Sequence, residues 1–406
     1  MFSKRINVAK GPNTLSQIVE AQKKQGRLSL DLTQSNPTKI GLAYDCKQIL
    51  AVLNRPEGLT YDPDPCGLKA TRNVISDYYQ KIEAPADPGS IYVTASTSEA
   101  YGVLFKLLGD PYDQILIPSP GYPLLSFLAR FESLDPVFYP LRYASKRGWY
   151  FDFDAIEARI SSKTRAVVVV NPNNPTGVYL KQHDLLTLNQ LCRKNNMALI
   201  VDEVFSDFHD DSLSISFVRT AVGKCKALTF VLNGFSKMVA LPQVKLGWIV
   251  VSGEVRQVEV AKERLEMLLD FYLSVSSQAQ HAAKGLLALR KDIQNQIKHR
   301  IAHNQKELKR QLARTSNCRM LIREGGWYAV VEIEDLLEEE AKVVQLLTED
   351  NTLVHPGYYY DFHREGFVVV SLLPNPQQFK QGIGNLVKRF GRNLNRTCYH
   401  VPSCRG

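Results

Sequence analysis

The chain has 406 residues and a formal net charge of +9. This length exceeds the size at which one hydrophobic core stops growing, so we expect two domains and exclude a small disulfide-stabilised scaffold. Hydrophobic residues make up 44% of the chain and charged residues 22%, which is typical of a globular protein and excludes a largely disordered or fibrous one.

The sequence carries no sign of export or of membrane insertion. Its longest apolar runs, such as Ala166 to Val170, are far shorter than the ~20 residues that cross a bilayer. The basic start MFSKRINVAKGPN is not followed by an apolar stretch, which argues against a secretory signal. The cysteines are odd in number and form no CxxC pair, so we expect reduced thiols, no metal site and a cytoplasmic protein. They are Cys46, Cys66, Cys192, Cys225, Cys318, Cys398 and Cys404.

Short apolar runs alternate with longer amphipathic ones over the first 250 residues. Several runs are continuous in Val, Ile and Leu, as expected for parallel strands covered on both faces. Helical stretches between them are long enough for crossover connections. We therefore predict an α/β fold whose large domain has a mainly parallel seven-stranded sheet with helices on both faces. The predicted strands are Ile91–Thr94, Gln114–Ile117, Pro136–Pro140, Ala166–Val170, Ala198–Val201, Ala227–Leu232 and Leu246–Val251. The predicted helices between them are Glu99–Leu108, Phe153–Ile160 and Asp184–Asn195.

The second half of the chain predicts a long helix and a smaller α+β domain. From about Leu286 to Glu324 there is no Gly or Pro and apolar residues recur near helical spacing, which predicts one or two long helices. A strand in GGWYAVVEIED, an acidic helix near Leu336 to Asp350 and the strand FVVVSLL follow. We expect residues 1–45 to join the small domain, 46–289 to form the large domain, and 290–406 to form the linking helix and the rest of the small domain.

The positive charge is concentrated between Arg290 and Arg323, where ten Lys or Arg residues accompany only Asp292 and Glu307. A basic helix can bind nucleic acid, but exposed charged helix faces are much commoner, and no aromatic residue is interleaved here. We therefore predict a solvated helix face and no nucleic-acid partner.

Polar residues follow five of the predicted strands. Ligands of open parallel sheets bind beyond the carboxyl ends of the strands, so these residues are expected to share one edge. They are Ser96-Thr97-Ser98-Glu99, Pro118-Ser119-Pro120-Gly121-Tyr122, Asn171-Pro172-Asn173-Asn174-Pro175-Thr176-Gly177, Asp202, and Gly234-Phe235-Ser236-Lys237.

Each of these segments also has an ordinary structural explanation. Ser96 to Glu99 fits a helix capping box, Asn174 a turn, Tyr122 a core residue, and Asp202 a helix cap or ion pair. Lys237 alone is a weak signal, because most lysines are solvated and only a buried one becomes a useful nucleophile. Together, however, a helix N-terminus with hydroxyls, an acid, an amide, an aromatic ring and a lysine are what pyridoxal 5'-phosphate requires.

The chain resembles the class I/II aminotransferases, the fold type I pyridoxal phosphate enzymes, nearly from end to end. The similarity runs from SNPT at Ser35 through YDPDPCGL at Tyr61 to HPGYYYDF at His355 and VVVSLL at Val368. NPNNPTG, DEVFSDF and FSKMVALPQVKLGW occur between them in the family's order and spacing. The resemblance implies that the large domain binds pyridoxal 5'-phosphate.

The resemblance also implies roles for individual residues. Lys237 would form a Schiff base with the cofactor and then shuttle a proton, while Asp202 would pair with the pyridine N–H. Asn174 would donate to the ring oxygen and Tyr122 would stack on the ring. The phosphate would be held by Ser96, Thr97, Ser98, Ser236, Lys245 and, from the neighbouring subunit of a homodimer with shared active sites, Tyr61.

Four positions depart from the family's commonest pattern. Phe205 stands in place of a tyrosine, Gly234 of a phosphate-binding serine, and Lys245 of a phosphate-binding arginine. Val369 stands in place of the arginine that clamps the substrate carboxylate, so another partner is needed. Arg364 is our candidate, although a surface arginine explains it too.

Further residues are candidates on the substrate side. Asn36, in the SNPT segment, is a possible second carboxylate contact. Trp327 and Tyr328 in GGWYAVV, with Tyr358 to Tyr360, are candidates to line the substrate side and favour an apolar or aromatic donor, and packing in the core of the small domain explains them equally well.

The leading hypothesis is a cytoplasmic, homodimeric aminotransferase that moves an amino group between an amino acid and a 2-oxo acid. A carbon–sulfur β-lyase is the enzymatic alternative, because the missing arginine affects how substrate is oriented over the cofactor. A non-catalytic ligand-sensing domain is a remote alternative. It predicts an attached DNA-binding module, for which the sequence has no room.

Overall fold

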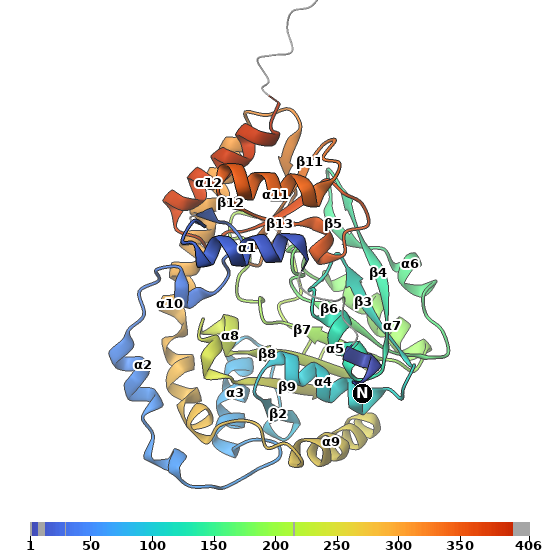
Figure 1. The fold of residues 1–406 in the computed structure, drawn as a ribbon. Helices are drawn as coiled ribbons and strands as arrows, with labels where there is room; N and C mark the ends of the chain where they lie inside the picture. The colour runs from blue at the N-terminus through green and yellow to red at the C-terminus, as the bar shows by residue number, and fades with distance from the viewer. Residues whose placement is uncertain (1, 7–12, 29, 214–215, 393–406) are drawn as a thin grey trace, which may run out of the picture.

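An eight-stranded sheet forms the centre of the protein, in a computed structural model that describes residues 2–6, 13–28, 30–213 and 216–392 (Figure 1). Its central strands β8, β7, β6, β3 and β4 are parallel, whereas β9 is antiparallel to both of its neighbours and β5 is antiparallel to β4. In spatial order the strands are β2 (Ile91–Thr94), β9 (Gly247–Ser252), β8 (Thr229–Gly234), β7 (Ala198–Asp202), β6 (Thr164–Val170), β3 (Gln114–Ser119), β4 (Asp135–Ala144) and β5 (Gly148–Phe151).

Alternate strand residues enter two separate cores, one on each face of the sheet. In β6, Val167 and Val169 belong to one core, and Ala166, Val168 and Val170 to the other. Both faces are apolar because helices cover both, which explains the continuous Val and Ile runs. The helices of the first core are α3 (Lys69–Lys81), α7 (Gln182–Lys194) and α10 (Ser277–Leu312); those of the second are α4 (Thr97–Leu108), α5 (Leu125–Phe131) and α9 (Val255–Asp270).

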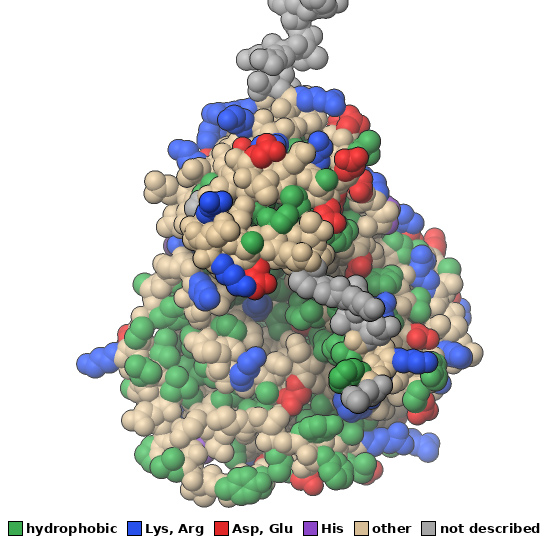
Figure 2. Space-filling view, viewed as in Figure 1, with side chains coloured by type: hydrophobic (Ala, Val, Ile, Leu, Met, Phe, Trp, Pro, Cys, Tyr) green, Lys and Arg blue, Asp and Glu red, His purple; other side chains and the backbone are tan. Residues whose placement is uncertain are grey.

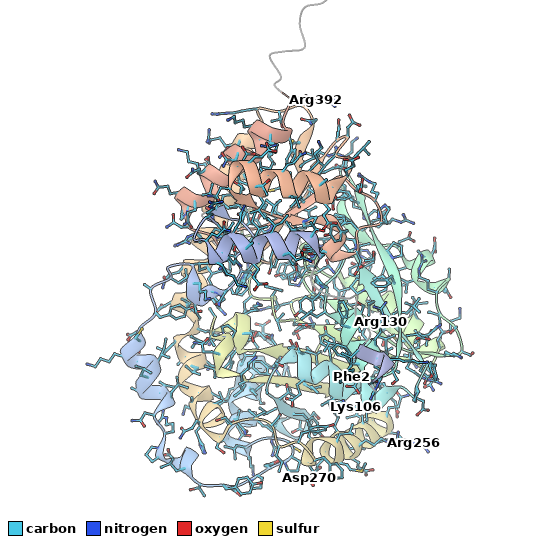
Figure 3. All side chains as sticks on the ribbon, viewed as in Figure 1. Phe2, Lys106, Arg130, Arg256, Asp270 and Arg392 are labelled. Carbon is cyan, nitrogen blue, oxygen red and sulfur yellow. The ribbon has the colours of Figure 1, made fainter. Side chains whose placement is uncertain are left out.

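A smaller pair of sheets lies at the other end of the molecule, and α10 runs between the two ends (Figure 1). Figure 3 marks this separation: Arg392, just beyond α12, lies opposite Asp270 at the end of α9. One small sheet has the order β10 (Cys318–Met320), β11 (Tyr328–Ile333), β14 (Phe367–Ser371) and β13 (His355–Pro356), and the other pairs β1 (Leu30–Asp31) with β12 (Thr352–Leu353). The associated helices are α1 (Thr14–Lys24), α11 (Glu339–Asp350) and α12 (Pro376–Phe390).

Short elements complete the fold. The remaining helices are α2 (Cys46–Leu53), α6 (Phe153–Glu157), α8 (Phe235–Met238) and the 3₁₀ turns η1 (Lys4–Ile6), η2 (Pro37–Lys39), η3 (Pro56–Leu59), η4 (Pro88–Ser90), η5 (Pro242–Val244) and η6 (Gly357–Tyr360). Among the described residues, no helix has the length and apolar character needed to cross a bilayer. The five described cysteines are free, and Cys398 and Cys404 lie outside the described residues.

The α/β fold was predicted correctly, but the sheet has eight strands rather than seven. The additional strand, β5, forms a hairpin with the last four residues of β4. Its four residues, GWYF, are too few to show an alternating pattern. The predicted strand Pro136–Pro140 also extends to Ala144, because this hairpin continues beyond the parallel part of the sheet.

The long helix was predicted with the wrong start and end. Helix α10 begins nine residues before Leu286 and ends at Leu312, and β10 occupies part of the stretch predicted as helical. Gly285, directly before the predicted stretch, lies within the helix, where a Cβ would meet Val52 of α2 at 2.5 Å. A glycine that allows two helices to approach closely cannot be told from a helix-ending one in the sequence.

Candidate active site

The five polar segments of the sequence meet at one edge of the large sheet. Strands β2, β8, β7, β6 and β3 all run in the same direction, so their carboxyl ends lie along the same side. A short helix, α8, begins directly after β8 and carries Ser236 and Lys237. Asp202 is the last residue of the neighbouring strand, β7.

Lys237 is enclosed by aromatic rings. Its Nζ atom lies 4.9 Å from the ring centre of Trp327 and 5.5 Å from that of Phe205. Burial lowers the pKa of the lysine to about 8, and the charge of Asp202 only partly opposes this shift. A substantial fraction of the amine is therefore neutral near pH 8, which is the form that attacks a carbonyl carbon.

Asp202 is buried at the same strand edge. Its Oδ1 accepts a hydrogen bond from the backbone N–H of Val204 at 3.0 Å, and its Oδ2 accepts one from the hydroxyl of Tyr101 at 3.0 Å. Burial nevertheless raises the pKa of Asp202 to about 6. The hydrogen bonds and the nearby Lys237 favour the carboxylate, but they do not fully offset the loss of water.

The N-terminus of α4 presents three hydroxyls beside this pair. Ser96 is the N-cap and accepts from Glu99 N–H at 3.1 Å. Only this half of the predicted capping box forms, because the Glu99 carboxylate accepts from the N–H of Ala95, one residue before the cap, at 2.5 Å rather than from that of Ser96. Thr97 and Ser98 open the helix, and Ser98 shares a hydrogen bond with Tyr122. Backbone N–H groups at a helix start attract anions, so this place suits a phosphate.

Two more residues of the predicted site lie here. Asn174 belongs to a buried loop after β6, and among the described residues its side-chain amide has no hydrogen-bond partner, leaving a buried oxygen unpaired. Tyr122 follows β3; burial first, and then the charge of Asp202, raise the pKa of its hydroxyl to about 12. An unsatisfied buried amide is costly, so Asn174 fits a residue held ready for a ligand.

Gly234 has a close neighbour that explains its lack of a side chain. A Cβ at Gly234 would lie 2.9 Å from the Cα of Gly247 in β9. A Cβ at Gly247 would in turn meet the backbone of Ser96 at 3.1 Å. These two glycines thus let β8, β9 and the start of α4 pack closely around the candidate phosphate position.

Two predicted residues, Arg364 and Tyr61, lie apart from this cluster within one chain. The guanidinium of Arg364 pairs with Glu332 and lies 4.3 Å above the ring of Phe367. Tyr61 is 81% exposed in a groove with Leu273. Lys245 is exposed at the end of η5.

The environment of Arg364 does not support its suggested role as carboxylate partner. The Glu332 carboxylate also pairs with Arg319, whose Nε lies 2.5 Å from Oε2, so both arginines neutralise one carboxylate on the small sheet. Val369 is fully buried in β14, paired with Val330 and His355. Asn36 uses its side-chain oxygen to cap η2, accepting from the N–H of Thr38 at 3.0 Å.

Several residues of the site escaped the sequence analysis. Tyr101 donates a hydrogen bond to Asp202 and so orients it. In the sequence, only a tyrosine on the buried face of a predicted helix could have indicated this role. Glu203, beside Asp202, is fully buried and accepts from Ala221 N–H at 2.7 Å. Tyr328 and Tyr360, by contrast, were expected from the sequence to line the substrate side, and their ring centres lie 6.4 Å apart. Burial first, and then the neighbouring hydroxyls of Tyr328 and Tyr122, raise the pKa of Tyr360.

The chain matches the family model "Aminotransferase class I and II" over residues 36–385. Glutamate-pyruvate aminotransferase AlaA of Haemophilus influenzae is 25% identical over 372 residues, covering 90% of this chain and 91% of that protein. The alanine aminotransferase of Mycobacterium tuberculosis is 26% identical over 382 residues, covering 91% of this chain and 86% of that protein. The solved alanine aminotransferase of Pyrococcus furiosus has the same fold, with a TM-score of 0.86, 22% identity, and coverage of 96% and 99%.

Proposed function

Because the chain belongs to the class I and II aminotransferase family and is therefore a transaminase, we propose that it uses pyridoxal 5'-phosphate bound at Lys237. The observation that carries this proposal is the partly buried Lys237, with its lowered pKa, beside a buried carboxylate. When bound, this cofactor supplies a ring that accepts the electrons released when a bond to the substrate α-carbon breaks.

The other residues of the edge fit the parts of this cofactor. Asp202 would accept a hydrogen bond from the ring N–H, and the side-chain N–H of the buried Asn174 would donate to the ring oxygen. Tyr122 would cover one face of the ring. The N-terminus of α4 with Ser96, Thr97 and Ser98 would hold the phosphate, together with Ser236 and Lys245.

Lys237 would bind the cofactor and later move a proton at the substrate α-carbon. With a pKa of about 8 the amine can both accept and release a proton near neutral pH. Trp327 and Phe205 exclude water from its Nζ atom, which keeps that pKa low.

The substrate side of the site is aromatic. Trp327, Tyr328 and Tyr360 come from the small-sheet end and face the lysine or Tyr122. We propose an amino acid and a 2-oxo acid as substrates, and the relatives named for alanine, glutamate and pyruvate supply the first candidates to test. Asn36 remains a proposed contact of the substrate carboxylate, whereas Arg364 is already paired.

A donor and acceptor screen tests the proposed function. Cofactor-loaded protein, mixed with an amino donor and pyruvate or 2-oxoglutarate, should produce the corresponding new amino acid. The variant Lys237→Ala should lose at least about 10³-fold in rate, because no other described lysine lies between these rings. Lys291→Ala, an exposed lysine of α10, is the matched control and should keep full activity. Ammonia and pyruvate formed without an acceptor, or full turnover by Lys237→Ala, would contradict the proposal.

We also propose a homodimer in which Tyr61 serves the neighbouring subunit. Tyr61 projects into solvent near a group of exposed apolar side chains on α2, η3 and the end of α9. Figure 2 shows hydrophobic side chains gathered over α2 and the lower end of the molecule. These residues are Leu50, Leu59, Met267, Phe271, Tyr272 and Leu273. Such a surface is typical of a subunit interface.

The proposed organisation and location complete this description. We propose residues 1–45 and 290–406 as the small domain with its linking helix, and 46–289 as the cofactor-binding domain; the pairing of β1 with β12 supports this division. We propose a cytoplasmic enzyme, which the free described cysteines support.

A further inference from the structure

A second cavity, of about 320 Å³, lies between α10 and the segment Phe208–Ser212. It is separate from Lys237, although Phe208, which lines it, packs with its ring centre 5.1 Å from that of Trp327. Its volume is in the range of pockets that hold small molecules. Four cationic side chains line the cavity against two carboxylates: Lys298, Lys306, Lys309 and Arg323 against Asp210 and Asp211.

Both carboxylates are already neutralised by neighbours. Asp211 pairs with His209 at 2.5 Å and with Lys298 at 3.5 Å. Asp210 accepts from Gln305 Nε2 at 2.6 Å and lies 3.6 Å from Arg323. These contacts leave the remaining cations without carboxylate partners in the cavity.

Lys306 and Lys309 are exposed on the cavity side of α10, and neither has an ion pair among the described residues. They stand on adjacent turns of the helix, so both ammonium groups can reach one ligand. They belong to the basic stretch that we interpreted from the sequence as a solvated helix face. Both side chains are indeed exposed, and the structure shows that they also line the cavity.

Arg323 is the buried part of this group. Only 3% of it is exposed; its Nη2 donates to the carbonyl oxygen of Gly326 at 2.7 Å, and its Nη1 donates to Gln305. Its Nε–H is buried and has no partner among the described residues. Burial lowers the pKa of Arg323 to about 10, since the charge of Asp210 at 3.6 Å only partly offsets the lost water. An unpaired buried donor on a cation is costly and is relieved by an acceptor that carries negative charge.

From this arrangement we infer that the cavity binds a small polyanion through Lys306, Lys309 and Arg323. The ligand chemistry is two or more negatively charged oxygens on one small molecule, as in a phosphorylated metabolite or a short polycarboxylate. Nucleic acid is a poor fit, because the cavity has the size of a small molecule.

Calorimetric titration of the cofactor-loaded protein tests the inference. The probes are inorganic phosphate and citrate, with glucose as an uncharged control, all at constant ionic strength because salt screens exposed charges. We expect saturable binding of at least one anion and none of glucose. Binding of phosphate alone would identify a phosphate ligand, and binding of citrate alone a polycarboxylate.

The variant Lys306→Gln/Lys309→Gln should weaken that binding by at least tenfold. Lys291→Gln, on the same helix but outside the cavity, is the matched control and should bind like the wild type. Because all three lysines are exposed, these changes should leave the fold intact, which the unchanged transaminase rate would verify. Saturable binding by neither anion, or equal affinity in the double variant and the wild type, would overturn the inference.

Discussion

At the scale of single residues, burial rather than pairing determines the chemistry of the site. Lys237 and Asp202 attract each other, yet burial favours the neutral form of each. It lowers the pKa of Lys237 to about 8 and raises that of Asp202 to about 6. The loss of water therefore outweighs the attraction between the two charges. The backbone N–H of Val204 and then the hydroxyl of Tyr101 keep the pKa of Asp202 from rising further, because each donates to the carboxylate at 3.0 Å.

We therefore predict that Tyr101→Phe raises the pKa of Asp202 and weakens cofactor binding by about tenfold. The variant leaves a buried carboxylate oxygen unpaired, which costs about 1–3 kcal/mol. Equilibrium titration of the cofactor, followed by absorbance at several pH values, measures both effects. Tyr139→Phe is the matched control, since Tyr139 is equally buried and donates to the carbonyl oxygen of Val168 at 2.8 Å, not to Asp202. Equal effects of the two changes on cofactor affinity would refute the role of Tyr101.

At the scale of elements, α10 connects the two ends of the molecule and depends on close contacts along its length. Gly285 allows α2 to approach, and Arg300 donates to the carbonyl oxygens of Ile40 at 3.1 Å and Leu373 at 2.9 Å. Asn304 donates to Leu372 and Pro374 in the same way. Side chains of this helix thus satisfy backbone groups of segments distant in sequence, and so fix the small-sheet end relative to the large sheet.

The contact at Gly285 predicts that Gly285→Ala destabilises the protein, although alanine has the higher helix propensity. The new methyl group would lie 2.5 Å from the side chain of Val52, and overpacking of this kind costs about 1–3 kcal/mol. Urea unfolding measures the change. Gly384→Ala, at a half-buried position of α12, is the control. A Cβ there would meet only Gln311 at an ordinary 3.5 Å, so the free energy of unfolding should rise by up to about 1 kcal/mol. If both substitutions raised the free energy of unfolding equally, the prediction would be wrong, since α2 and α10 would then accommodate the added methyl group without cost.

At the scale of the whole molecule, buried carboxyl groups make stability depend on pH. Burial raises the pKa of Glu203 from 4.5 to about 8, so the folded state binds this proton more tightly than the unfolded state. Its favourable contribution is present below pH 4.5 and is lost as the pH rises from there through about 8. Asp202 acts in the same direction between about pH 4 and 6.

We expect the cofactor-free wild type to lose stability between pH 5 and pH 9, and Glu203→Gln to lose less, by about 2–4 kcal/mol. Glutamine resembles the protonated acid at every pH and can keep the bond from Ala221 N–H. Urea unfolding at pH 5, 7 and 9 measures the difference. Glu307→Gln is the control. It should change the free energy of unfolding by the same amount at all three pH values, because the hydrogen bond from Arg310 lowers the pKa of Glu307 to about 2 and keeps it ionised throughout. Parallel curves for the wild type and Glu203→Gln would show that Glu203 does not titrate in this window.

The exposed apolar surface makes a prediction about assembly. Leu59→Asp combined with Phe271→Asp should convert the proposed dimer into monomers and reduce transaminase activity, because Tyr61 could no longer reach a neighbouring site. Light scattering coupled to gel filtration measures the mass. Leu186→Asp, at a half-exposed leucine of α7, is the control and should leave the dimer intact. A wild type that is already monomeric and fully active would contradict the proposal.

Local patterns accounted for most of the large sheet and for the residues at its edge. Strands such as Thr164–Val170 and Ala198–Asp202 were recognisable because burial on both faces requires uninterrupted Val and Ile. The position of Asp202 and Lys237 at strand ends then followed from the direction of parallel strands. What escaped were contacts between distant segments: Tyr101 with Asp202, and Val52 with Gly285.

The sequence by itself determined the α/β architecture, the family and the edge where the acid, the amide and the lysine meet, because each depends on spacing within short segments. Only the tertiary structure decided that Arg364 is paired with Glu332 and that the exposed Lys306 and Lys309 line a cavity. It also determined that burial brings the pKa values of Lys237 and Asp202 toward each other. The physical reason is that a side chain's charge partners and access to water are set by segments far away along the chain.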